Sequence, residues 1–223
     1  MPYYPILVDL KGKKVVVVGG GAVALRKIET LLECGASVKV ISRELIPELK
    51  EYLDEGKIKL IGREYREEDL EGAFMLIAAT DDKTLNSRVS KFARDRGMLV
   101  NTVDQPSDCN FIVPSVIKRG DLVIAVSTSG KSPAMAKRIG EKLRNQFGDE
   151  YKDFLVIMGK IRKEILAKGL SQEENSRIFN EIADSFMLEA IGRKDWQGVA
   201  TTLEKILKRD ISKNDIINYL KAE

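Results

Sequence analysis

The chain has 223 residues, of which 43% are hydrophobic and 32% are charged, and this length suits one large domain or two small ones. So much apolar material excludes collagen-like and disordered chains. The 37 basic and 34 acidic residues leave a net charge of only +3, which does not indicate a nucleic-acid partner.

The longest apolar runs, 15–18 and 74–79, are far shorter than the roughly 20 residues that span a bilayer. The first residues lack the basic stretch of a signal peptide. Two cysteines cannot build a disulfide framework. We therefore expect a cytoplasmic protein with no membrane partner.

Histidine is absent. This excludes a Ser-His-Asp triad and any histidine-ligated metal site, and we expect no bound metal. Any proton transfer must use Asp, Glu, Lys, Tyr, Cys or water.

The first half of the chain alternates short apolar runs with helical patterns. Strands are expected over 14–18, 38–41, 58–61, 74–79 and 98–100, with helices over 23–33, 46–55 and 84–96 between them. Continuous apolar strands separated by helices indicate a parallel sheet covered on both faces. The predicted fold class is α/β, with a doubly wound sheet of the Rossmann type.

The rhythm changes near residue 111. Two strand-like runs, 111–117 and 122–127, flank a basic turn over 118–121 and predict a hairpin. Helices are then expected over 133–147, 151–168, 172–191, 196–209 and 215–221. Ser132 is the expected N-cap of the first of these helices, with Pro133 at its first position. We place a domain boundary near 113–115.

A glycine turn follows the first predicted strand. Gly19, Gly21 and Ala24 match the pattern G-x-G-x-x-A between a strand and a helix. In dinucleotide sites Gly19 would form the tight turn, and Gly21 would let the backbone approach the pyrophosphate. Ala24 would let the helix pack closely on the strand. The alternative is a glycine turn in an ordinary βα unit.

The second strand ends in Ile41-Ser42-Arg43-Glu44, where an acidic residue commonly binds the ribose 2′-hydroxyl. Arg43 favours a 2′-phosphate and therefore NADP, whereas Glu44 could bind a free hydroxyl. The spacing leaves the choice open, and both side chains could simply be solvated.

Several longer motifs, taken together, resemble precorrin-2 dehydrogenase, the NAD-dependent module that also forms the N-terminal part of siroheme synthase. Along residues 5–145 these motifs are Gly19-Gly20-Gly21 with Val23-Ala24 and Arg26-Lys27, Leu31-Leu32, Cys34-Gly35-Ala36, Ala78-Ala79-Thr80-Asp81-Asp82 with Asn86, Asn101-Thr102-Val103-Asp104, Phe111-Ile112-Val113-Pro114-Ser115, and Ile124-Ala125-Val126-Ser127-Thr128-Ser129-Gly130-Lys131-Ser132-Pro133. The helical tail is similar only in length and character.

The resemblance implies NAD-dependent dehydrogenation of precorrin-2, a tetrapyrrole with eight carboxylates, to sirohydrochlorin on the route to siroheme. It implies a homodimer with three regions: a Rossmann NAD-binding domain over 1–113, a strand-containing dimerisation region over 114–149, and a helical C-terminal region over 150–223. It places Gly21, Ala22 and Val23 on the dinucleotide diphosphate and Arg43 and Glu44 on the adenosine ribose; Gly19 belongs to the same cofactor site.

The resemblance also makes Asp104 the essential carboxylate. Asp104 follows the fifth predicted strand, where ligands of such sheets bind, and a carboxylate can accept the proton that leaves with the hydride. The alternative is a cap of the turn over 104–106. Asp81 and Asp82 are expected to cap the next helix rather than touch the cofactor.

Polar side chains further along the chain are candidates for the rest of the site. Thr80, a cofactor residue, and Asn101, a substrate residue, stand at strand ends where they could line the nicotinamide side. The loop before the helix at 133 could hold substrate carboxylates through Thr128, Ser129, Lys131 and Ser132. Thr128 stands where fused siroheme synthases have a serine. Basic residues nearby could add positive charge or be ordinary surface charges: Lys118, Arg119, Lys137 and Arg138. Cys109 is expected to be inert packing.

Three functions therefore compete. The leading one is a precorrin-2 dehydrogenase acting without a methyltransferase half. A second adds iron insertion, as in bifunctional relatives, and the sequence leaves it open. The third is an NAD-sensing regulatory domain.

Overall fold

A computed structural model describes residues 3–221. The chain divides into two compact units, Met1–Val113 and Pro114–Glu223. Within the described residues, every helix is too short or too polar to cross a bilayer.

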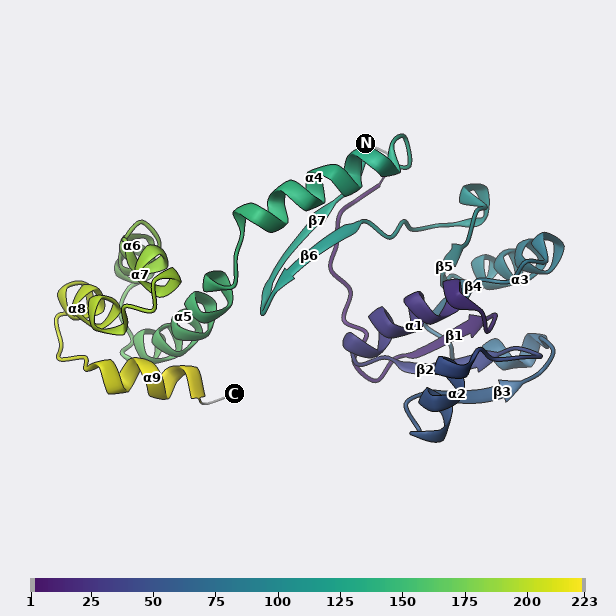
Figure 1. The fold of residues 1–223 in the computed structure, drawn as a ribbon, viewed down its shortest axis with the longest axis horizontal. Coiled ribbons are helices and arrows are strands. Elements are labelled where there is room, and N and C mark those ends of the chain that lie inside the picture. The colour runs from purple at the N-terminus through teal and green to yellow at the C-terminus, as the bar shows by residue number, and fades with distance from the viewer. Residues whose placement is uncertain (1–2, 222–223) are drawn as a thin grey trace. The chain divides into compact units, whose positions relative to one another are not determined.

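The first unit is built on a parallel five-stranded sheet (Figure 1). Its strands are β1 (Lys14–Val18), β2 (Ser37–Ile41), β3 (Lys59–Gly62), β4 (Met75–Ala78) and β5 (Leu99–Thr102), in the order β3-β2-β1-β4-β5. Between the strands lie α1 (Ala22–Glu33), α2 (Pro47–Asp54) and α3 (Lys83–Asp95), together with short 3₁₀ turns at Glu67–Leu70 and Pro106–Asp108. The order confirms the prediction of a doubly wound α/β fold, with β1 at the switch point where ligands bind.

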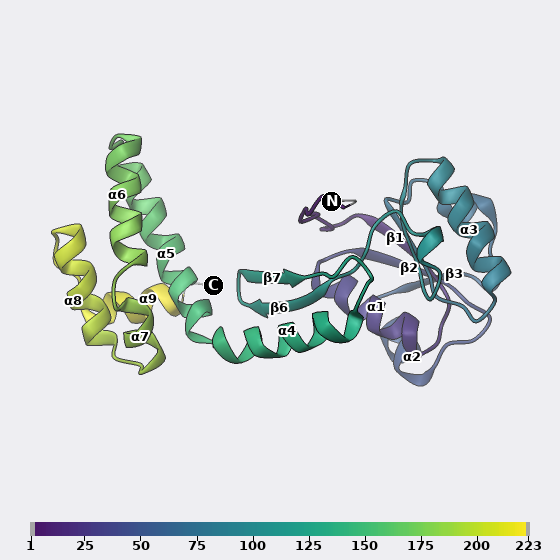
Figure 2. The same ribbon diagram turned by 90° about the horizontal axis from the view of Figure 1, so that it is seen from above.

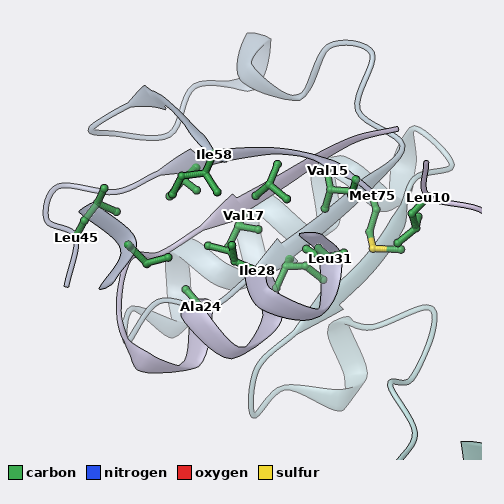
Figure 3. Close-up of a cluster of buried hydrophobic side chains, with 14 residues drawn as sticks. Leu10, Val15, Val17, Ala24, Ile28, Leu31, Leu45, Ile58 and Met75 are labelled. Carbon is green, nitrogen blue, oxygen red and sulfur yellow. The ribbon is translucent and has the colours of Figure 1, made fainter. Parts of the chain in front are cut away.

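Alternate residues of the central strands enter two separate cores. Val15 and Val17 face α1 and α2, where they pack with Ala24, Ile28 and Met75 (Figure 3). Odd- and even-numbered residues of β1 enter different cores because successive side chains of a strand point to opposite faces of the sheet. Even-numbered residues of β1, β4 and β5 form the second core with Val89 of α3: Val16, Val18, Leu76 and Val100. The helices therefore cover both faces of the sheet (Figure 2), which explains why its strands are apolar throughout.

The second unit begins with a two-stranded hairpin of β6 (Ser115–Arg119) and β7 (Leu122–Val126). A strand was expected over 111–117, but β6 starts four residues later. Asn101 donates to the carbonyl of Phe111 at 3.4 Å, so residue 111 belongs to the edge of β5 and not to the hairpin. The basic turn over 118–121 is also wrong in extent, because Arg119 pairs with Leu122. The turn is only Gly120-Asp121, with Gly120 at φ +57°, as in tight hairpin turns with glycine first.

Up to residue 221, where the described part of the chain ends, six helices follow: α4 (Pro133–Gln146), α5 (Glu150–Ala167), α6 (Gln172–Ala183), α7 (Met187–Gly192), α8 (Trp196–Leu207) and α9 (Lys213–Lys221). The single helix expected over 172–191 is wrong, because the chain breaks between α6 and α7. The Ser185 hydroxyl donates to the Ile182 carbonyl at 2.7 Å and accepts from the Met187 amide at 3.3 Å. This local bonding competes with continuation of the helix, and the break places Ile182 and Met187 in one core.

Candidate functional site

The first unit carries a cleft of about 940 Å³ at the carboxyl ends of its strands. The loops after β1, β2, β3 and β4 form its walls. All seven residues expected to bind the dinucleotide line it: Gly19, Gly21, Ala22, Val23, Arg43, Glu44 and Thr80. The residues expected to act on the substrate do not line this cleft.

Three consecutive glycines at the end of β1 have three different surroundings. Gly19 has φ +128°, and a Cβ there would collide with the backbone carbonyl of Ala79. A Cβ at Gly20 would collide with the carbonyl of Glu44. A Cβ at Gly21 would meet nothing within 4 Å. The first two glycines therefore let the loops of the sheet approach each other, whereas the third leaves room for a ligand.

Gly21 is also the N-cap of α1, and it gives the first turn no side-chain hydrogen bond. The first amides of a helix need acceptors from outside the helix, and they favour an anion. An open backbone face beside such a terminus suits a pyrophosphate. These residues therefore fit a dinucleotide, whose phosphates would lie next to Gly21, Ala22 and Val23.

The loop after β2 presents opposite charges to the cleft. The Ser42 hydroxyl donates to the Glu44 carbonyl at 2.6 Å and closes the loop. The Arg43 Nη2 lies 2.8 Å from Glu64 Oε1, with the two side chains 80% and 72% exposed. The guanidinium that favoured a 2′-phosphate in the sequence thus already has a carboxylate partner.

Thr80, after β4, is held by a buried side chain of α3. Asn86 is 1% exposed. Its Oδ1 accepts from the Thr80 hydroxyl at 2.8 Å, and its Nδ2 donates to the Thr80 carbonyl at 2.8 Å. The Thr80 hydroxyl also reaches the Asp82 carbonyl at 3.2 Å. Its proton is therefore used within the protein, and Thr80 shapes the cleft through its position. Asp82 accepts from the Leu85 amide at 3.0 Å as the N-cap of α3, as expected.

Sequence reasoning missed part of the cleft wall. Arg63, Glu64, Tyr65 and Arg88 line it. The Arg88 guanidinium lies 5.9 Å from the centre of the Tyr65 ring. Burial of the hydroxyl raises the pKa of Tyr65 to about 12. One signal could have found three of them, because residues 63–65 directly follow a strand that ends at the same sheet edge.

Asp104 lies in the loop after β5, outside the residues that line the cleft. Its side chain is exposed, and its backbone has φ +59°. In the described part of the chain, its carboxylate makes no hydrogen bond, so nothing there supports the alternative role as a turn cap.

The loop that carries Asp104 is tied to α3. Ser87 donates to Asp108 Oδ2 at 2.6 Å and accepts from Gln105 Nε2 at 2.8 Å. Arg94 donates to the Ser107 carbonyl at 2.9 Å and lies 3.6 Å from Asp108 Oδ1. One helix therefore holds both the cleft wall at Thr80 and the Asp104 loop.

Asn101 and Cys109 make hydrogen bonds at the end of β5 and do not line the cleft. The Cys109 sulfur accepts from the Thr102 amide at 3.1 Å and from Asn101 Nδ2 at 3.7 Å. The thiol thus ties the loop back to β5, in keeping with its expected packing role.

In the second unit, the polar loop before α4 is organised by its own hydroxyls. Ser132 accepts from the Met135 amide at 3.3 Å as the N-cap, as expected. Thr128 Oγ1 accepts from the Ser132 amide at 3.1 Å. Ser129 has φ +53°, and both it and Lys131 are exposed. Each hydroxyl that accepts here keeps its own proton free to donate.

The sequence left open whether Arg119 supplies positive charge for an anion. In the structure its guanidinium is hydrogen-bonded within the protein instead. Its guanidinium donates to the carbonyls of Phe147 at 3.0 Å and Arg144 at 3.1 Å. It thereby caps the C-terminal end of α4 from the hairpin.

Comparison with known proteins agrees with this geometry. Residues 6–115 match the family described as "Putative NAD(P)-binding", and residues 119–146 match "Sirohaem biosynthesis protein central". The first unit is thus an NAD(P)-binding domain.

Relatives match over most of the chain. A siroheme synthase of Photorhabdus laumondii is 35% identical over 97% of this chain and 45% of its own length. That of Neisseria meningitidis serogroup C is 40% identical over 81% of this chain and 38% of its own length. The chain thus spans less than half the length of these relatives. The solved structure of "SirC, precorrin-2 dehydrogenase" is 30% identical, with a TM-score of 0.76 over 92% of this chain and 100% of that one. The chain belongs to the precorrin-2 dehydrogenase family.

Proposed function

We propose that this protein oxidises precorrin-2 to sirohydrochlorin with NAD⁺ in siroheme biosynthesis. The observation that carries the proposal is the full-length likeness to a solved precorrin-2 dehydrogenase. The open backbone cradle at Gly21 supports it from the chemistry of the site. NAD⁺ is present in the cytoplasm, and we expect the protein to be located there.

In this proposal the first turn of α1 binds the dinucleotide diphosphate through its amides. Arg43 and Glu44 flank the adenosine ribose, while Thr80 lines the cleft beyond the glycine turn. We assign NAD⁺ rather than NADP⁺, because Glu44 and the paired Arg43 leave no unopposed cation in the loop after β2. A bound NAD⁺ supplies the acceptor for the hydride.

Oxidation removes two hydrogens from precorrin-2, one as a hydride to NAD⁺ and one as a proton. Asp104 is the proposed acceptor of the proton. Its carboxylate is exposed and free of protein partners in the described residues, so it stays available to the substrate. The ties from Ser87 and Arg94 to its loop hold it in place.

The substrate is a polyanion, and the proposed contacts are hydrogen-bond donors and one cation. Thr128, Ser129 and Ser132 offer hydroxyl protons, and Lys131 offers an ammonium group. Asn101 is a weaker candidate for substrate binding, because its side-chain amide already donates to Cys109 and to the Phe111 carbonyl.

We also propose a homodimer through residues 114–149. The hairpin buries one face against α4, where a side chain at Gly140 would press on Ser115. Its other face leaves Val116 45% and Val123 40% exposed. A two-stranded hairpin with an apolar open face is marginal alone, and a second copy would cover it.

The test mixes the purified protein with precorrin-2 and NAD⁺ and follows NADH absorbance. We expect NADH to appear in proportion to the precorrin-2 lost, with little turnover when NADP⁺ replaces NAD⁺. A protein that binds NAD⁺ but forms no NADH would contradict the proposal and indicate an NAD sensor.

A further inference from the structure

An ion pair joins two neighbouring strand ends at the wall of the cleft. Arg43 follows β2 and Glu64 follows β3, and these strands are adjacent and parallel. Parallel neighbours end at the same edge of a sheet, so residues 21 positions apart meet there. The Arg43 Nη2 donates to Glu64 Oε1 at 2.8 Å, and both residues line the cleft.

The end of the second strand is where dinucleotide sites read the adenosine 2′ position. An arginine there accommodates a 2′-phosphate, whereas a carboxylate binds the free 2′-hydroxyl. This chain has both, Arg43 and Glu44. Glu64 adds a second carboxylate, so the three side chains together carry one net negative charge.

Two other cations line the cleft. The Arg88 guanidinium lies over the Tyr65 ring. Arg63 is exposed and directly precedes Glu64. Arg43 is therefore the cation at the end of β2 itself, and Glu64 is the residue that neutralises it.

We propose that Glu64 determines the preference for NAD⁺ over NADP⁺. The Glu64 carboxylate pairs with the Arg43 guanidinium, which is then unavailable to bind the 2′-phosphate of NADP⁺. The same carboxylate also repels that phosphate. This inference rests on the proposed NAD⁺-dependent function and names a specificity residue that the glycine and second-strand motifs do not include.

The exposure of the pair makes the proposal testable without unfolding the protein. Exposed ion pairs contribute little to stability, and the side chains here are 80% and 72% exposed. A substitution at Glu64 should therefore change ligand binding and leave thermal unfolding almost unchanged.

The experiment measures the dissociation constants of NAD⁺ and NADP⁺ by isothermal titration calorimetry on the full chain. In Glu64→Gln we expect NADP⁺ to bind about fivefold more tightly, as expected for freeing one exposed charge-assisted contact. NAD⁺ affinity should change by less than about twofold on the same reasoning. The matched control is Glu29→Gln, an exposed glutamate of α1 outside the cleft with the same change of net charge.

A second variant tests whether the effect passes through Arg43. In Arg43→Ala combined with Glu64→Gln, the gain in NADP⁺ affinity should disappear. Equal ratios of the two dissociation constants in wild type and Glu64→Gln would overturn the proposal. So would a parallel loss of both ligands, which would make Glu64 structural. If wild type binds neither dinucleotide, the proposed function fails rather than this inference alone.

Discussion

The two compact units bury their sheets in different ways. In the first, the central strand β1 is covered on both faces, and Val15, Val16 and Val17 are all 0% exposed. In the second, the hairpin is covered on one face only. Ile117 is 2% exposed, while its neighbour Val116 is 45% exposed. A parallel sheet carries its own covering helices between its strands, whereas a hairpin does not.

The difference separates two kinds of functional surface. The first unit completes its cleft with its own residues, so dinucleotide binding is expected to tolerate changes on the hairpin. The open hairpin face is an incomplete structure that we assign to a second copy.

The largest effect is expected at Asp104, in the first unit but outside the cleft. In Asp104→Asn, dehydrogenation should fall by about 10²–10⁴ because the proposed general base is lost. Asparagine tolerates the left-handed backbone at this position, so it is a cleaner variant than alanine. NAD⁺ affinity should stay nearly unchanged by calorimetry. Retention of most activity would remove Asp104 from the mechanism.

The first and third glycines of the turn should differ in how much an alanine costs. Gly19→Ala combines a positive φ with a collision against the Ala79 carbonyl, and should lower the free energy of unfolding by roughly 3 kcal/mol. Gly21→Ala has open space and should cost less than about 1 kcal/mol. Chemical denaturation measures both.

Gly21→Ala should instead weaken dinucleotide binding, because its methyl group enters the space left for the pyrophosphate. Calorimetry with NAD⁺ checks this. If Gly21→Ala binds NAD⁺ as tightly as wild type does, the diphosphate does not lie against the backbone at Gly21, and the open space there is not part of the binding site.

The hairpin faces give the matched pair in the second unit. Lysine at both Val116 and Val123 should leave the chain folded and convert the proposed dimer to a monomer, which light scattering at micromolar concentration would detect. Ile117→Lys, on the buried face, should instead destabilise folding by several kcal/mol, because it buries a charge without a partner. A dimer that survives the double substitution would move the interface elsewhere.

The smallest effect is expected at Tyr65. Its hydroxyl oxygen is buried and has no hydrogen-bond partner among the described residues. Tyr65→Phe should therefore stabilise the first unit by about 1 kcal/mol.

The same residue affects stability in alkaline solution. Burial raises the pKa of Tyr65 from its ordinary value of 10 to about 12, so the unfolded state loses its proton first. Stability should fall as the pH rises from 10 to about 12. In Tyr65→Phe this part of the fall should be absent, as thermal melts across that range would show. Equal slopes would contradict the assignment.

Local signals were enough to predict most of the first unit. The valine run of β1, the glycine turn and the cap at Asp82 each depend on residues within a few positions, and so does the cap at Ser132 in the second unit. Strand propensity, positive φ and capping act over that range. The sheet and most of the dinucleotide cleft could therefore be predicted without coordinates.

Errors arose where a bond made by a side chain decided the local structure. The helix over 172–191 breaks at Ser185, whose hydroxyl bonds to the nearby backbone, and the break lets Ile182 and Met187 enter one core. Phe111 is held by Asn101, so the first hairpin strand starts later than its apolar pattern predicts. The sequence allows Arg119 to be a free surface charge, but in the structure its guanidinium donates to carbonyls at the C-terminal end of α4.

By itself, the sequence determined the α/β class, the position of the glycine turn and the residues that follow β1 and β2, because periodicity and turn chemistry are properties of neighbouring residues. Only the tertiary structure decided that Glu64 meets Arg43 and that Asn86 holds Thr80. The first contact depends on the register of β2 and β3, and the second on how α3 packs against the end of β4. Pairing and packing of this kind bring together atoms that chain order leaves apart.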